Sequence, residues 1–110
     1  MMDNFDKMVV VSNEGGIVPL SKFNEMTSQE RRDLRGDVLL NIDFIRRVKT
    51  YKRDNDDNKQ YSWLAVQLDT DITYLVTALD VQDMRSQFDT ARNRNQHFIL
   101  MQGFEVDADK

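Results

Sequence analysis

The side chains best suited to binding chemistry are basic and aromatic residues that alternate along two neighbouring segments of the chain. They are Arg47, Lys49, Tyr51, Arg53, Tyr61 and Trp63. Aromatic rings and arginine are the residues that most often anchor protein interfaces. The same residue types can hold single-stranded nucleic acid, because bases stack on the rings while the cations contact phosphates. Their spacing therefore predicts a binding surface, either for a protein or for a nucleic acid.

Groups suited to catalysis are few. His97 is the only histidine and the chain has no cysteine, so a catalytic triad or a histidine metal site would depend on His97 alone. Residues 54–60 are predicted to be a polar hairpin loop. They begin with the spacing of a calcium loop, but Lys59 and Ala65 replace the glycine and the glutamate that such a loop requires. We expect no cofactor, no metal and no enzymatic activity. The alternative, an enzyme or small-ligand binder that uses His97, would need a concave pocket between the last strand and a helix over about residues 80–95.

The element that organises these side chains is a hairpin predicted over residues 61–79. Two runs rich in β-branched and aromatic residues flank a polar turn at residues 69–71, which is a strong hairpin signal. Side chains alternate between the two faces of a strand, so the even-numbered residues should form one wall of the core. They are Leu64, Val66, Leu68, Ile72, Tyr74, Val76 and Ala78.

Residues 38–53 are open to two interpretations. Apolar residues at the even positions favour one long strand. A helix with an apolar stripe through Leu39, Ile42 and Ile45 is the competing interpretation. As a strand, this segment would complete a three-stranded meander with the hairpin. The pairs expected across its first two strands are Val48 with Val66, Thr50 with Leu64, Tyr51 with Trp63 and Arg53 with Tyr61.

The odd-numbered face of this meander, called here the odd face, is the predicted binding site. Its members are Arg47, Lys49, Tyr51, Arg53, Tyr61, Trp63, Leu75 and Leu79. Either the N-terminal segment or a short helix covers this face as a second core layer, or the face is an exposed binding surface. Contiguous apolar patches on protein surfaces often mark interfaces.

Four further elements are expected around the meander. They are a hairpin formed by residues 7–12 and 17–20, a short helix over residues 27–34, a helix over about residues 80–95, and a last strand over residues 97–106 that is buried on both faces. Thr27 and Glu30 have the spacing of a capping box. Gly36 is suited to a left-handed cap after the short helix, and Asp80 is a favourable N-cap for the longer one.

Together these expectations describe one α+β domain over residues 1–110, with 1–6 and 107–110 frayed. The sheet is mainly antiparallel and the element order is β-β-α-β-β-β-α-β. The composition is 40% hydrophobic and 31% charged, which is typical of a globular domain. The sequence contains no long apolar run and no secretion signal, so we expect a cytoplasmic protein that does not insert into a membrane.

The charge distribution bears on the class of partner. The formal net charge is −4, but residues 45–53 contain five cations and no acid. Overall acidity disfavours non-specific nucleic-acid binding, which depends on neutralising phosphates. The leading hypothesis is therefore a small intracellular module that acts through protein–protein contact, such as a regulator or an inhibitor of the kind carried by phages and mobile elements, with homodimerisation as its simplest form. Single-stranded nucleic-acid binding on the odd face is the alternative.

Overall fold

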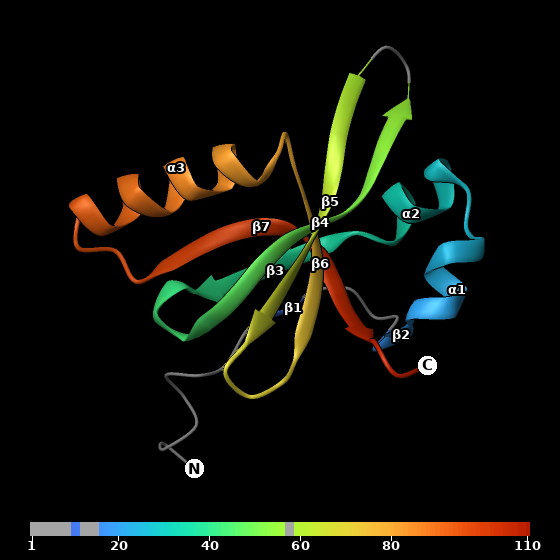
Figure 1. The fold of residues 1–110 in the computed structure, drawn as a ribbon, viewed down its shortest axis with the longest axis horizontal. Coiled ribbons are helices and arrows are strands. Elements are labelled where there is room, and N and C mark those ends of the chain that lie inside the picture. The colour runs from blue at the N-terminus through green and yellow to red at the C-terminus, as the bar shows by residue number, and fades with distance from the viewer. Residues whose placement is uncertain (1–9, 12–15, 57–58) are drawn as a thin grey trace.

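The computed structural model describes residues 10–11, 16–56 and 59–110, and its strands form one curled sheet with helices on both faces (Figure 1). The elements, in chain order, are β1 (Val10–Val11), β2 (Val18–Pro19), α1 (Leu20–Glu25), α2 (Ser28–Leu34), β3 (Gly36–Asn41), the 3₁₀ turn η2 (Ile42–Phe44), β4 (Ile45–Asp56), β5 (Lys59–Leu68), β6 (Thr73–Ala78), α3 (Val81–Asn93) and β7 (Phe98–Asp107). The fold is therefore α+β, as predicted.

The last strand, β7, joins the two halves of the sheet. The strand order is β1-β3-β7-β6-β5-β4, and β2 runs parallel to the end of β7, which makes the sheet mixed. β7 pairs first with β3 and then with β6, and the exchange occurs at Gly103, which is paired with both strands. A Cβ at this position would lie 2.0 Å from the backbone oxygen of Leu75. Glycine is needed here because the backbone of β6 approaches too closely for any side chain.

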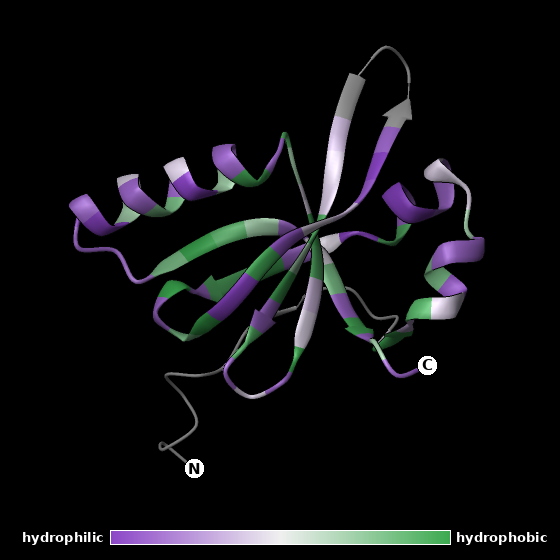
Figure 2. Ribbon diagram, in the orientation of Figure 1, coloured by the Kyte–Doolittle hydropathy of each residue, from purple (hydrophilic) through white to green (hydrophobic). Residues whose placement is uncertain are grey.

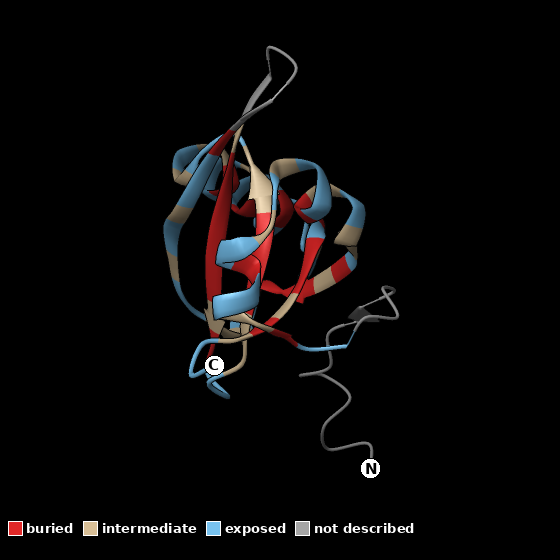
Figure 3. Ribbon diagram, turned by 90° about the vertical axis from the view of Figure 1, so that its right-hand side faces the viewer, coloured by how far each residue is buried: buried red, intermediate tan, exposed pale blue. Residues whose placement is uncertain are grey.

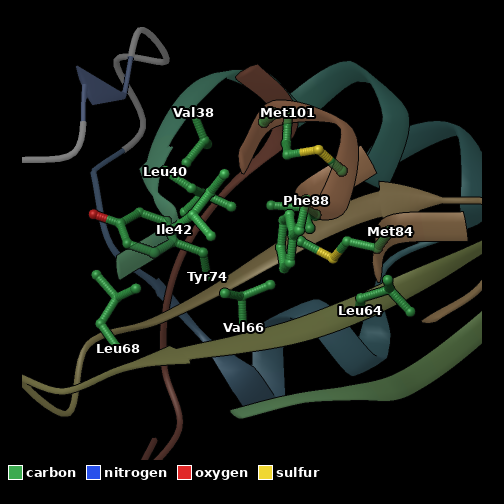
Figure 4. Packing of buried hydrophobic residues seen from close by; sticks show 12 residues of the cluster. Val38, Leu40, Ile42, Leu64, Val66, Leu68, Tyr74, Met84, Phe88 and Met101 are labelled. Atoms are coloured by element: carbon green, nitrogen blue, oxygen red, sulfur yellow. The ribbon is translucent and has the colours of Figure 1, made fainter. Parts of the chain in front are cut away.

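The predicted hairpin is confirmed as β5 and β6. Leu64 pairs with Val76 and Val66 pairs with Tyr74, in the register expected from the turn. α3 covers the even-numbered face of these strands and begins at Asp80, whose carboxylate accepts a hydrogen bond of 2.7 Å from the Asp83 amide. The buried residues of this layer form the α3 core (Figure 4), which consists of Val38, Leu40, Ile42, Leu64, Val66, Leu68, Tyr74, Val76, Met84, Phe88, Ala91 and Met101.

The opposite face of the sheet is covered by α1 and α2, so a second core lies beneath them. In the view that faces these helices, exposed helical segments lie in front of buried strands (Figure 3). The residues of this layer, called here the α1 core, are Val18, Phe23, Trp63, Ala65, Leu75, Phe104 and Val106. The hydropathy colouring shows polar positions on the outward sides of the helices and apolar positions along the strands between them (Figure 2).

Residues 38–53 are extended, but they do not form the single strand that the alternation predicted. They divide into β3 and β4, which lie on different halves of the sheet. Two hydrogen bonds mark the division, one of them local and the other to the start of β7. The Asn41 side chain accepts from the Asp43 amide at 3.0 Å, and the Ile42 amide donates to the carbonyl of His97 at 2.8 Å. Such side-chain bonds compete with a continuous strand, and alternation of apolar residues does not reveal them.

The prediction of a hairpin from residues 7–12 and 17–20 was wrong. Among the described residues, β1 pairs with β3 and β2 pairs with β7, so these two strands do not pair with each other. The remainder of the predicted hairpin, residues 7–9 and 12–15, lies outside the described residues, as do residues 1–6, which were expected to be frayed. The helix α1 was not predicted. Its start follows Pro19, and its one buried residue, Phe23, contacts the α1 core.

Two further expectations require correction. The capping box of α2 is present, with bonds of 3.1 Å and 2.9 Å between Thr27 and Glu30. However, Gly36 does not adopt a left-handed cap, because Arg35 ends the helix in an extended conformation and Gly36 is the first residue of β3. β7 is also not buried on both faces along its length, since Leu100 is 59% exposed. At the other end of the strand, the segment expected to be frayed begins with Asp107, which is the last residue of β7, and the Lys110 carbonyl accepts a bond of 3.3 Å from the Ser21 amide.

Within the described ranges, none of the helices has the length and apolar character needed to span a membrane.

Candidate binding site

A β-bulge at Tyr51 determines how the odd face is built. Before it, β4 pairs with β5 as predicted, with Thr50 opposite Leu64. After it, Lys52 is opposite Trp63, so Tyr51 is the extra residue of the bulge. The predicted pairs of Tyr51 with Trp63 and of Arg53 with Tyr61 are therefore wrong. A shift of one residue turns every later side chain of the strand to the other face.

The main consequence of this shift is that Asp54 points into the protein. It was expected in a polar loop, but it lies in β4 and is only 3% exposed. Its carboxylate accepts a hydrogen bond of 2.8 Å from the Trp63 indole and forms an ion pair of 3.3 Å with Arg31, which is equally buried. Arg31 also donates to the carbonyl of Phe23 at 3.1 Å. This network ties both short helices to the sheet.

Aromatic packing closes the part of the odd face that lies around Trp63. The ring of Phe23 packs edge-on against Trp63, with 5.2 Å between the ring centroids, and Tyr61 contacts Trp63 at 6.2 Å. The Arg35 guanidinium lies 5.7 Å from the centre of the Tyr61 ring. Trp63 has no exposed surface and Leu75 is 1% exposed. Of the two arrangements considered from the sequence, the covered one is found at these positions.

The predicted residues other than Tyr61 and Trp63 fall into two groups. Arg53 and Leu79 are exposed and do not join the others, because Arg53 follows the bulge and Leu79 lies beyond the end of β6. The other four, Arg47, Lys49, Tyr51 and Leu75, come together around an open cavity of about 180 Å³ on the uncovered part of the odd face, called here the cationic cavity. Its lining consists of Leu20, Arg47, Lys49, Tyr51, Ala65, Gln67, Thr73, Leu75, Val106 and Ala108.

The cavity has an apolar floor and a cationic rim. Ala65 and Leu75 are buried beneath it, while Arg47 and Lys49 are exposed at its margin. Neither cation forms an ion pair with any residue in the described ranges. Tyr51 forms a wall whose orientation is set by α1, because its hydroxyl donates to the Asn24 side chain at 2.9 Å. An anionic group with an adjoining apolar part matches this combination of rim and floor.

A neighbouring cavity has the opposite charge. It shares Gln67, Thr73, Val106 and Ala108 with the cationic cavity. Its carboxylates are Asp71, Glu105, Asp107 and Asp109. Burial raises the pKa of Glu105 above its usual value. The surface is therefore cationic along β4 and anionic near the start of β6 and the end of β7.

His97 lies apart from both cavities. Its Nδ1 is 2.9 Å from an Asp43 carboxylate oxygen, and both side chains are largely exposed. A groove does lie between α3 and β7, with Gln96 and Phe98 in its lining, but His97 is not part of that lining. The described part of the chain contains no group of three or more potential metal ligands from histidine, cysteine or carboxylate side chains.

Sequence reasoning missed the contribution of the first helix to the site. Leu20 lines the cavity and Phe23 covers Trp63, and the spacing of these two apolar residues after Pro19 is a weak sign of a helix start. The chain matches no protein-family model, no curated protein and no solved structure.

Proposed function

We propose that this protein is a small, non-enzymatic binding module that acts through protein–protein contact and recognises an acidic segment of its partner at the cationic cavity. The observation that carries this proposal is the pair Arg47 and Lys49. Both are exposed above an apolar floor, and neither is neutralised by a described residue. A glutamate of the partner would supply the missing counter-charge, and the methylene groups of the same side chain would contact Leu20 and Leu75.

Nucleic-acid binding receives less support from the same surface. Base stacking needs accessible aromatic faces, whereas Trp63 is fully buried under Phe23 and Tyr61 lies beneath Arg35. Tyr51 is half-buried and bonded to Asn24. The cations could contact phosphates, but the formal net charge of −4 opposes a polyanion at longer range.

The test uses a fluorescein-labelled heptapeptide in which valine and glutamate alternate, with binding measured by fluorescence anisotropy. We expect saturable binding that weakens as salt is added, because the contacts with Arg47 and Lys49 are exposed to screening. The double variant Arg47→Glu/Lys49→Glu should lose at least tenfold in affinity. Its matched control is Lys52→Glu/Arg53→Glu, which changes the net charge equally on the same strand, away from the cavity. The control should stay within about threefold of wild type.

Three results would overturn the proposal. The first is the absence of saturable binding, and the second is an equal loss of affinity in the two double variants. The third is tighter binding of an oligothymidylate than of the peptide, which would assign the cations to phosphate recognition instead.

A further inference from the structure

The outer edge of β4 is open along the strand that carries the cationic cavity. β4 ends the sheet, and no described strand pairs with its outer side. An edge strand presents unpaired backbone donors and acceptors, and natural proteins protect such edges with charged side chains and bulges. Both devices are present here, since β4 carries exposed cations and has irregular register at Arg46 and Tyr51. Between these two positions, residues 47–50 pair regularly with β5.

A second cavity lies on the other face of the same strand. It separates β4 from α3, has a volume of about 290 Å³, and is lined by Ile45, Arg46, Arg47, Val48, Arg85, Phe88, Asp89 and Arg92. Arg46 is paired with Asp71 at 3.1 Å, and Arg92 lies 3.7 Å from Asp89. Arg85 has no ion-pair partner among the residues that the structure describes. This cavity therefore also combines excess positive charge with an apolar floor.

The two cavities meet at the edge of β4. Arg47 lines both of them, so the cationic cavity and the cavity beside α3 lie on opposite faces of β4 at the same position along the strand. Side chains of an extended segment alternate between two faces. A segment lying along this edge would therefore direct successive side chains into the two cavities in turn, while its backbone faced the backbone of β4.

We infer that the partner's acidic segment binds as an additional β-strand on the outer edge of β4. This inference rests on the proposed function and specifies its geometry. Main-chain hydrogen bonds to residues 47–50 provide affinity, and the two cavities select side chains that are acidic or apolar, as in other complexes formed by strand addition. The regular stretch between the two irregular positions fixes where the added strand pairs.

Charge complementarity identifies the occupant. A second copy that offered its own β4 would place like charges opposite each other, which destabilises strand pairing. The cations that prevent pairing between copies therefore favour an acidic strand, and one set of residues excludes one partner while it attracts another. The carboxylates at the ends of β6 and β7 limit the acidic strand on that side of the site.

The decisive experiment compares two N-methylated forms of the alternating Val-Glu heptapeptide. Alternate amides of a strand point to the same edge, so one form is methylated at the odd residues and the other at the even residues. Methylation of the amides that face β4 should reduce affinity at least tenfold, because it removes donors and adds bulk. Methylation of the other set should leave affinity within about threefold of the parent peptide.

A second measurement follows the protein. Hydrogen exchange should slow at alternate amides of residues 47–50 when the parent peptide is saturating, and the Lys52→Glu/Arg53→Glu control should show the same protection. If the parent peptide binds but both methylated forms bind alike and exchange is unchanged, strand addition is wrong while the proposed function stands. If the parent peptide does not bind, the proposed function itself has failed. Concentration-dependent dimerisation that Arg47→Glu abolishes would instead assign the edge to a second copy.

Discussion

The two faces of the sheet are packed in different ways, although the same strands build both. On the α3 face, apolar side chains at alternate positions form a core, and none of the charged residues that the structure describes is buried in it. On the α1 face, the charged pair of Arg31 and Asp54 is buried beside Trp63, and the cationic cavity remains open next to it. Regular alternation is sufficient for the first face, whereas the second depends on the bulge at Tyr51. The irregular strand β4 thus supplies Asp54 to the buried polar network and Arg47, Lys49 and Tyr51 to the cationic cavity.

This difference should also appear in how the two faces respond to substitution. Apolar cores accept exchanges of similar volume at low cost. A buried polar network does not, because each member leaves its partner without a bond when it is removed. If the α1 face has this second character, removal of one member of its network should cost more free energy of unfolding than a volume-conserving exchange on the α3 face.

The largest effect is expected for Asp54→Ala. The change leaves the Arg31 guanidinium buried without a counter-charge, and it removes the acceptor of the Trp63 indole. Breaking a buried ion pair in this way costs about 3–5 kcal/mol. The free energy of unfolding, measured by urea denaturation, should fall by this amount.

The double variant Arg31→Met/Asp54→Leu provides the control, because replacing both partners removes the unpaired charge. It should be more stable than Asp54→Ala, since apolar replacement of a whole pair is often neutral. A loss below about 1 kcal/mol for Asp54→Ala would mean that the network is solvated, and the contrast between the two faces would disappear.

The same contrast explains which parts of the fold could be predicted from the sequence. The hairpin of β5 and β6 and the helix α3 were predicted because their signals are local. A turn sets the register, apolar residues recur with a fixed period, and Asp80 caps the helix. The α3 face follows directly from the alternation in these strands.

The other face could not be predicted in the same way. The bulge at Tyr51 has no signature in the alternation, and Asp54 resembled a loop residue because its buried partner, Arg31, lies 23 residues away in the chain. Of the predicted binding residues, Arg47, Lys49, Tyr51 and Leu75 are brought to one cavity because they precede the bulge or lie on a regular strand. Arg53 follows the bulge, so the alternation of side chains along an uninterrupted strand assigns it to the wrong face.

A smaller effect should separate two conservative changes, one on each face. Trp63→Phe keeps an aromatic ring in the α1 core but removes the donor to Asp54, which should cost about 1–3 kcal/mol for the unsatisfied acceptor. Met84→Leu, in the α3 core, keeps the volume and should cost less than about 1.5 kcal/mol. Thermal and urea unfolding of both variants give the comparison. Equal losses would indicate that the indole hydrogen bond contributes nothing beyond packing.

The smallest effect concerns Glu105, which lies opposite Tyr74 at the margin of the α3 face. Burial raises the pKa of Glu105, and burial together with the charge of Glu105 raises the pKa of Tyr74 to about 12. A carboxyl with a higher pKa in the folded than in the unfolded protein stabilises the fold fully below its unfolded value, near 4.5. That contribution is lost as the pH rises through the folded value.

The variant Glu105→Gln should therefore match wild type near pH 3, where Glu105 is protonated in both states, and should be more stable at pH 7. The gain should remain below about 1 kcal/mol, because the side chain is largely solvated. Urea denaturation at the two pH values measures it, and Asp109→Asn, an exposed change on the same rim, is the matched control. A gain at pH 7 for both variants would reflect the general excess of negative charge. A gain confined to Glu105→Gln would show that the regular face also carries a local electrostatic cost, at the point where it borders the anionic cavity.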